Sequence, residues 1–224
     1  MFFFREEMVD GTLPAKEYER SKGFELFLQY TDEKKVLGSA VRDILGLGWN
    51  GTLLDIGCGD GSLTEIVAHN AKETYILEQS PRLLAQARMR NIQNLCTVQC
   101  SFTDDSLPVK CDVVLLSHVL YFLPDWSVAL QKAFDTARDS LIVVHLFAGG
   151  EYGDLLSSWM PRLTGRSAAT FSDRVGEVLR SSGMAYESRV VQSSIRIPSL
   201  EDALTISEFF FESPQESWGS QREE

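Results

Sequence analysis

The fold of this chain is decided by the stretch Thr52-Leu53-Leu54-Asp55-Ile56-Gly57-Cys58-Gly59-Asp60-Gly61-Ser62-Leu63-Thr64. Apolar and β-prone residues lead into an acid, and three glycines then alternate with small or polar residues. The pattern predicts a strand that ends at Ile56, a tight turn, and a helix that begins at about Ser62. Glycines in such a turn allow a positive φ and let a ligand approach the backbone without meeting a Cβ. Because the first N–H groups of the helix lack helical partners, the turn is suited to a carboxylate, a ribose or a phosphate.

The segments that follow repeat this order of strand and helix. Strands are predicted at 52–56, 74–78, 96–100, 111–117 and 140–147, and helices at about 62–70, 81–91 and 125–137. Ser80-Pro81 is typical of a helix start, since Ser caps the first turn and Pro is accepted at the first helical position. The alternation predicts an α/β fold with parallel strands and helices on both faces, which binds ligands beyond the carboxyl ends of the strands.

The composition limits the kinds of partner. The chain has 224 residues, of which 44% are hydrophobic and 24% charged, and this suits one globular α/β domain. The net charge of −11 argues against a nucleic-acid partner, because phosphate binding needs a basic surface. The cysteines, at 58, 96, 100 and 111, form no Cys-x-x-Cys motif and have no clustered histidines, so no metal site is predicted. The opening Met1-Phe2-Phe3-Phe4-Arg5-Glu6-Glu7 is typical of neither a signal peptide nor a membrane span, so we expect a cytoplasmic protein without a membrane partner.

The ends of the chain are predicted to be accessory to a core at 51–212. Residues 1–50 are expected to be helical, with one helix that begins at Pro14 and a second with an apolar side over 36–45, and to cover the mouth of the binding site. Residues 213–224 are polar and are expected to form a frayed tail.

Two classes of nucleotide-binding loop compete for the glycine turn. A dinucleotide fold requires Gly-x-Gly-x-x-Gly and an acid about 20 residues later that binds the ribose. The spacing here is Gly57-x-Gly59-x-Gly61. The string from Leu54 to Gly61 instead closely resembles the first motif of the Rossmann-like, class I S-adenosylmethionine (SAM)-dependent methyltransferases. The resemblance implies that the motif binds the methionine part and the ribose of SAM, and that Glu78, at the end of the second strand, accepts both ribose hydroxyls.

The same resemblance implies the other contacts of the cofactor. Ser101 stands where these enzymes often have an acid that reaches the adenine amine. A hydroxyl can accept that bond too, Asp104 or Asp105 could replace it, and a plain strand-end turn is the alternative. The cofactor-binding residues implied in this way are Asp55, Gly57, Cys58, Gly59, Glu78, Gln79, Ser101, Phe102 and Ser117.

A narrower resemblance involves the loop after the fourth strand, Ser117-His118-Val119-Leu120-Tyr121-Phe122. Together with Phe24-x-x-Phe27-Leu28 and Glu33 upstream, and Phe171-Ser172-Asp173 and the 199–211 helix downstream, this loop is similar to the histamine N-methyltransferase-like small-molecule methyltransferases. The similarity implies that Glu33 holds an amine of the acceptor, that His118 faces the acceptor, and that Tyr121 and Phe122 flank its ring.

Three residues are therefore predicted to act on the acceptor: His118, Tyr121 and Glu33. His118 could orient the acceptor or act as a base, because imidazole titrates near neutrality. Ordinary explanations stay open as well, since Glu33 is also an acid in the first turn of a helix and His118 also a loop histidine. His145, which ends the fifth strand, is expected to bond to the backbone.

Members of the methyltransferase class usually finish the sheet with a β-hairpin. Here one β-prone stretch, 184–197, is followed after Phe211 by polar residues alone. We therefore expect a Rossmann-like, doubly wound, mostly parallel sheet of six or seven strands. Either 184–197 fills its edge, or a partner subunit supplies the last strand in a homodimer, because an unpaired apolar edge promotes association.

The predicted function is methyl transfer from SAM to a small-molecule acceptor. A nitrogen of amine or imidazole type is the first expectation and an oxygen the second, because motifs that bind SAM do not report the acceptor atom. Two other classes stay open. A NAD-type oxidoreductase agrees with the glycine turn and Glu78 but not with the glycine spacing, and a non-catalytic SAM-binding module would lack an acceptor cavity.

Overall fold

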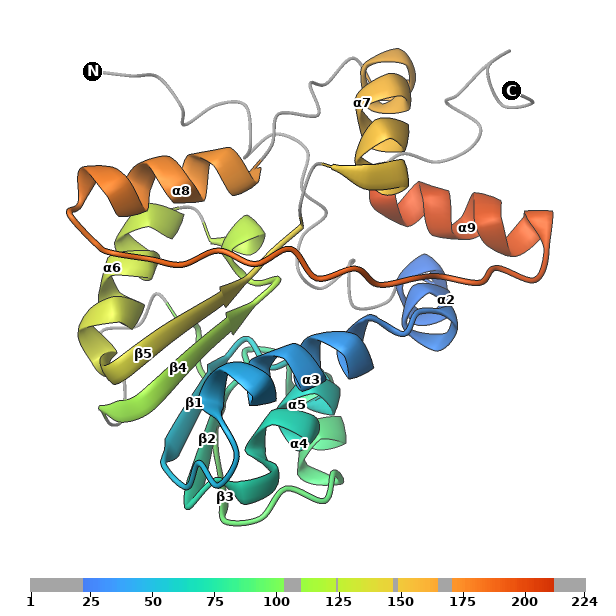
Figure 1. Cartoon of the computed structure of the whole chain (residues 1–224). Coiled ribbons are helices and arrows are strands. Elements are labelled where there is room, and N and C mark those ends of the chain that lie inside the picture. The colour runs from blue at the N-terminus through green and yellow to red at the C-terminus, as the bar shows by residue number, and fades with distance from the viewer. Residues whose placement is uncertain (1–21, 103–109, 124, 147–148, 165–170, 212–224) are drawn as a thin grey trace. The chain divides into compact units, whose positions relative to one another are not determined.

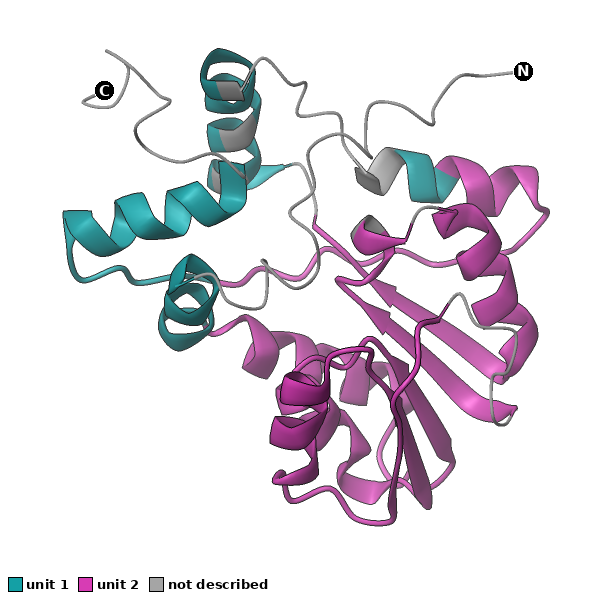
Figure 2. Cartoon of the chain, turned by 180° about the vertical axis from the view of Figure 1, so that it is seen from behind, with its two compact units in different colours: residues 1–31, 147–176, 194–224 teal, residues 32–146, 177–193 magenta. Residues whose placement is uncertain are grey.

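A computed structural model describes residues 22–102, 110–123, 125–146, 149–164 and 171–211 (Figure 1). The chain divides into two compact units (Figure 2). The first unit comprises residues 1–31, 147–176 and 194–224, and the second comprises residues 32–146 and 177–193. Of the helices in the described ranges, none combines the length and the apolar character that crossing a membrane requires.

The second unit contains a five-stranded sheet. Its strands are β1 (Thr52–Ile56), β2 (Glu73–Leu77), β3 (Leu95–Val98), β4 (Cys111–Ser117) and β5 (Ala137–Val144). They lie in the order β3-β2-β1-β4-β5, and every neighbouring pair is parallel. The chain order reverses between β1 and β4, so the carboxyl ends of these two strands flank the crevice in which open α/β sheets bind ligands.

Helices cover both faces of this sheet, as predicted. The helices of the unit are α3 (Glu33–Leu45), α4 (Ser62–Val67), η1 (Ala68–Asn70), α5 (Pro81–Arg88), η2 (Leu120–Phe122) and α6 (Trp126–Thr136). The helices α3 and α4 share a buried apolar cluster with β1 and β4, and α5 packs on Ile76 of β2. The helix α6 packs on β4 and β5 from the other side (Figure 1). Ser80 caps α5 as expected, since its side chain accepts from Leu83 N at 3.2 Å and Pro81 follows.

The number of strands corrects the sequence prediction. The described residues form five parallel strands, not six or seven in a mostly parallel sheet. Within the expected strand at 184–197, Ile195 makes one isolated antiparallel bridge, with Thr31, and the segment contains no strand. A strand needs one face to bury. Most side chains of this stretch are exposed, and Val191 packs against the apolar cluster of the sheet.

The described part of the first unit is helical. It contains α2 (Lys22–Tyr30), α7 (Gly150–Thr164) and α9 (Leu200–Phe211), and the helix α8 (Phe171–Ser181) has residues in both units. The helices α2 and α9 pack so closely that a Cβ on Gly23 would lie only 2.7 Å from Phe209 Cβ. Tyr30 Oη donates to Asp202 Oδ2 at 3.0 Å.

The boundaries predicted for the domains stay a prediction. Two helices, α2 and α3, lie within the segment 1–50, but α3 belongs to the compact unit of the sheet. The expected helix start at Pro14 and the tail at 213–224 lie outside the described residues.

Candidate active site

The glycine turn connects β1 to α4 and leaves one open position. Gly57, Gly59 and Gly61 have φ values of +70°, +60° and +75°. A Cβ on Gly57 would lie 2.5 Å from Val119 Cγ2, and one on Gly61 would lie 2.8 Å from Ala87 Cβ. A Cβ on Gly59 would meet nothing within 4 Å. Two of the glycines are therefore needed for packing, whereas the third leaves space beside the backbone.

Glu78 follows β2 and turns its carboxylate toward the glycine turn. Its Oε2 accepts from Gly59 N at 2.9 Å, and its Oε1 accepts from Ser80 N at 2.8 Å. The residue is 7% exposed. A carboxylate has about four acceptor directions, so a side chain in this position is suited to accept from hydroxyl groups of a ligand. Glu78 is thus a buried acceptor fixed in orientation beside the open position at Gly59.

Two buried polar atoms lie at the carboxyl ends of β1 and β4. Asp55 Oδ2 accepts from Thr64 Oγ1 at 2.6 Å, while Asp55 Oδ1 and Ser117 Oγ have no hydrogen-bond partner among the described residues. Burial raises the pKa of Asp55 to about 6, although the Thr64 bond and Lys34 act in the opposite direction. Native proteins rarely leave buried polar atoms unpaired, so these two atoms indicate the position of a polar ligand or water.

The site residues described so far and Glu33 do not form one continuous motif in the sequence. We use the name β1–β2 cradle for Asp55, Gly57–Gly61, Glu78 and Ser117. These residues fit a SAM-type ligand, because they combine an open backbone position, a fixed acceptor for hydroxyl donors and two unsatisfied buried polar atoms.

Glu33 and His118 lie together. Glu33, the first residue of α3, places Oε1 3.3 Å from His118 Nε2 and 3.5 Å from Lys34 Nζ. The side chains of Glu33 and His118 are 13% and 21% exposed. Burial raises the pKa of the Glu33 carboxyl, but the bond and charge of His118, helped by Lys34, outweigh it and lower the pKa to about 2. Glu33 is therefore a carboxylate at neutral pH.

The backbone of His118 is in an unfavourable region. Its φ is +52°, and its N–H donates to Val144 O at 2.9 Å, one residue beyond the parallel pairing of β4 with β5. A left-handed conformation costs a residue with a Cβ about 1–2 kcal/mol, and such strain is frequent at functional sites. Nearby, His145 Nδ1 lies 3.1 Å from Leu146 O, which confirms the expected backbone contact of that histidine.

The other predicted residues lie in different settings. The Cys58 thiol is half-buried, and burial beside Asp55 and Glu78 raises its pKa, so it stays a neutral thiol. Gln79 is exposed and Ser101 half-buried. Phe102 is buried, with Lys132 Nζ 5.2 Å from its ring centroid. Tyr121 belongs to η2, but its side chain lies outside the described residues, as do Asp104 and Asp105.

The sequence prediction missed three residues of the site. Lys34 was not predicted, although it directly follows Glu33. Thr64 was not predicted either, although it lies in the helix that follows the glycine turn. Arg90 was missed as well, and it donates to Asp60 in the glycine turn. Within the described ranges, no three His, Cys, Asp or Glu side chains are grouped so that they could hold a metal ion.

Comparison with known proteins agrees with this geometry. Residues 54–140 match the family described as methyltransferase domain. Over 100 residues the chain is 26% identical to (S)-coclaurine N-methyltransferase of Thalictrum flavum subsp. glaucum. That match covers 42% of this chain and only 28% of the length of the plant enzyme.

Two solved structures share the fold. A candidate methyltransferase of Bacillus halodurans is 16% identical, with a TM-score of 0.53 over 65% of this chain and 68% of that chain. A candidate SAM-dependent methyltransferase of Methanococcus maripaludis is 19% identical, with a TM-score of 0.54 over 80% of this chain and 87% of that chain.

Proposed function

We propose that this chain, whose residues 54–140 match the family described as methyltransferase domain, transfers a methyl group from SAM to a small-molecule acceptor. We further propose that the methylated atom is a nitrogen of an amine or imidazole. The observation that carries the proposal is the buried Glu78 carboxylate, which the amides of Gly59 and Ser80 hold beside the open position at Gly59. When bound, SAM supplies an electrophilic methyl group on a sulfonium.

The β1–β2 cradle would hold the nucleoside and the methionine part. In the proposal, Glu78 accepts the ribose hydroxyls, and Asp55 Oδ1 and Ser117 Oγ serve polar groups of the ligand, since both atoms are buried without partners in the described structure. Ser101 and Phe102 would contact the adenine, with Gln79 beside the ribose. A carboxylate that accepts from two ligand hydroxyls also discriminates strongly against ligands that lack these hydroxyls, because such a ligand leaves buried acceptors unpaired.

The Glu33–His118 pair would serve the acceptor. Because Glu33 is ionised and faces Nε2, it favours a proton on that nitrogen, so the basic lone pair of the neutral imidazole lies on Nδ1. An ammonium or a hydroxyl must lose a proton before its lone pair can attack a methyl group. We propose that His118 accepts this proton and that Glu33 orients it. In the alternative, Glu33 holds the acceptor amine itself, while its Oε1 keeps the contacts with His118 and Lys34.

The nitrogen acceptor rests on two resemblances. The plant relative is an N-methyltransferase by name, and the loop that contains His118 and Tyr121 resembles histamine N-methyltransferase-like enzymes. An oxygen acceptor is the second candidate, because the same pair of side chains would also deprotonate a phenol.

Calorimetry and a methylation assay test the proposal. The product S-adenosylhomocysteine should bind with micromolar affinity, and NAD should not. Radiolabelled SAM is then offered with biogenic amines, imidazoles or phenols, and we expect label on amines or imidazoles. Label on phenols alone would replace the nitrogen by the oxygen acceptor. If S-adenosylhomocysteine binds but no acceptor is labelled, the chain is a binding module. Binding of NAD in place of the product would sink the proposal entirely.

A homodimer stays part of the proposal. The strand β5 ends the strand order of the described sheet, and unpaired strand edges promote association. Sedimentation equilibrium should give twice the monomer mass, and a monomer at all concentrations would exclude a partner strand.

A further inference from the structure

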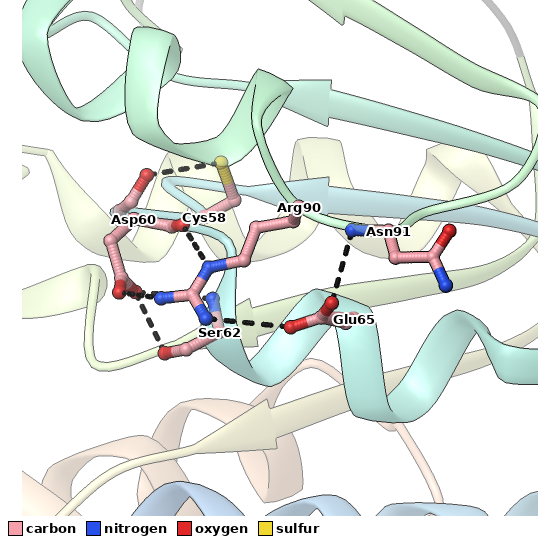
Figure 3. Close-up of polar contacts among 7 residues, drawn as sticks. Cys58, Asp60, Ser62, Glu65, Arg90 and Asn91 are labelled. Atoms are coloured by element: carbon pink, nitrogen blue, oxygen red, sulfur yellow. Dashed lines mark hydrogen bonds and ion pairs between the residues drawn. The ribbon is translucent and has the colours of Figure 1, made fainter.

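One cation ties the glycine turn to the next helix. Arg90 lies two residues beyond the end of α5 and uses all parts of its guanidinium (Figure 3). Its Nε donates to Asp60 O at 3.1 Å, its Nη2 donates to Asp60 Oδ2, and its Nη1 lies 3.4 Å from Glu65 Oε2. The guanidinium thus bonds the backbone and the side chain of one turn residue and, at the same time, the first turn of α4.

The two carboxylates have further partners on both sides. Asp60 Oδ1 accepts from Ser62 N at 3.1 Å and from Ser62 Oγ at 2.7 Å, and Glu65 Oε1 accepts from Asn91 N at 3.0 Å (Figure 3). Burial raises the pKa of Asp60, but the Ser62 bonds and then Arg90 outweigh it, so the pKa is lowered. Asp60 is therefore charged at neutral pH and joins the turn, the start of α4 and Arg90.

The turn needs such a restraint. Three left-handed glycines within five residues have a large conformational freedom in the unbound chain, and fixing them has an entropic cost. Gly59 N donates to Glu78, and Gly57 N and Cys58 N donate to Leu77 O at 2.8 and 3.4 Å, but the position beside Gly59 is open. On the other side, the turn is restrained by the bonds of Arg90 and by the close approach of Gly61 to Ala87. A turn that is already fixed binds its ligand with a smaller loss of entropy.

We propose that Arg90 is a positioning residue of the SAM site, which holds the glycine turn in its ligand-binding conformation without touching the ligand. The proposal rests on the proposed use of the turn as the SAM site. The new element is that affinity for the nucleoside depends on the ion pair between Arg90 and Asp60, which does not touch the ligand. Removal of Arg90 then weakens cofactor binding by releasing the turn, and a bound ligand partly restores the turn.

The test measures binding and backbone protection in the intact chain. For Arg90→Ala we expect the dissociation constant of S-adenosylhomocysteine to rise about tenfold, because charge-assisted bonds of this kind contribute on that scale. Arg90→Lys keeps the charge but not the forked geometry, and it should recover only part of the affinity. Asp60→Asn provides a second route to the same loss if Arg90→Ala folds poorly.

Arg88→Ala is the matched control. Arg88 lies in the last turn of α5, and its guanidinium donates to Thr97 Oγ1 alone among the contacts described for it, so its removal should change affinity less than twofold. Hydrogen–deuterium exchange of residues 57–62 supplies a second readout. In ligand-free Arg90→Ala the amides of the turn should exchange about tenfold faster than in the wild type, and saturating ligand should slow them again.

The outcomes separate the two proposals. A wild-type chain that does not bind S-adenosylhomocysteine would overturn the proposed function and the role of Arg90 together. A wild-type chain that binds, with Arg90→Ala and Asp60→Asn binding equally well, would overturn the role of Arg90 alone. Equal losses in Arg88→Ala and Arg90→Ala would also overturn it, because they would report general destabilisation.

Discussion

The β1–β2 cradle and the Glu33–His118 pair are connected in different ways. In the cradle, Glu78 reaches Gly59 across 19 residues and Thr64 reaches Asp55 across 9, so both bonds lie within two successive strand–helix units. The pair instead joins the start of α3, before the sheet, to the loop after β4. The bonds of Glu78 and Thr64 in the cradle follow from a local motif. The contact of Glu33 with His118, like the place of Ser117 in the cradle, requires the whole unit to be packed.

The two regions also differ in charge compensation. Asp55 has a hydroxyl partner on one oxygen and none described on the other, and burial raises its pKa to about 6. Glu33 is half-buried, but His118 and Lys34 outweigh the effect of burial and lower its pKa to about 2. The cradle therefore leaves polar groups for a ligand to satisfy, while the pair is compensated by the protein itself. The cradle should govern binding and the pair should govern turnover.

The largest expected effect is that of Glu78→Ala on the cradle. Two backbone amides would lose their acceptor and the ligand would lose its hydroxyl acceptor, so affinity for S-adenosylhomocysteine should fall by about 1,000-fold. Calorimetry measures this loss. Glu73→Ala, at an exposed acid that begins β2, is the control and should bind as the wild type does. A loss of affinity below about tenfold would show that Glu78 is not a main contact of the ligand.

His118→Ala tests the other half of the comparison. Loss of a general base lowers kcat by about 100-fold or more, and affinity for S-adenosylhomocysteine should change less than threefold. Glu33→Gln should reduce kcat by about tenfold and alter the pH dependence of kcat, because the imidazole loses its anionic partner. His69→Ala, at an exposed position within η1, is the control. If His118→Ala weakened binding more than turnover, the pair would belong to the cofactor side.

Two glycines of the cradle should separate binding from folding. Gly59→Ala is strained by its φ but meets open space, so we expect about 1–2 kcal/mol of destabilisation and about tenfold weaker ligand binding. Gly57→Ala adds a clash with Val119 and should lose about 2–4 kcal/mol of unfolding free energy. Urea denaturation beside calorimetry gives both quantities. Equal stability losses would contradict the distinction between an open and a packed glycine.

The smallest expected effects are opposite dependences of stability on pH. The pKa of Glu33 is lowered to about 2, so its contribution is present above the ordinary carboxyl pKa and is lost as the pH falls toward 2. The pKa of Asp55 is raised to about 6, so its ionisation weakens the ligand-free protein as the pH rises through 6. Asp55→Asn should therefore gain about 1–2 kcal/mol over the wild type at pH 8, and the gain should shrink by pH 5. Denaturant titrations at both pH values measure it, and a gain that grows on acidification would contradict the sign.

The sequence predicted the cradle better than the edge of the sheet. Ser80-Pro81 and the string from Leu54 to Gly61 form local structures whose bonds close within a few residues, and these agree with the structure. The stretch 184–197 has β propensity but few side chains that reach a buried face, and it forms no strand. Propensity alone does not decide pairing, because a strand is stabilised by the neighbour and the face that it meets.

Arg90 illustrates why part of the site could not be predicted. Its bonds to Asp60 and Glu65 depend on how α5 ends against α4, and no motif links these positions. The approach of Glu33 to His118 likewise depends on the packing of α3 on the sheet.

The sequence by itself determined the alternation of strands and helices, the glycine turn and the acid after the second strand, because periodicity and turn chemistry act over a few residues. The tertiary structure alone decided which buried carboxylate is compensated, how many strands pair and which cation restrains the turn. Those properties depend on contacts between residues far apart in the chain, and burial and distance in the folded unit set their energies.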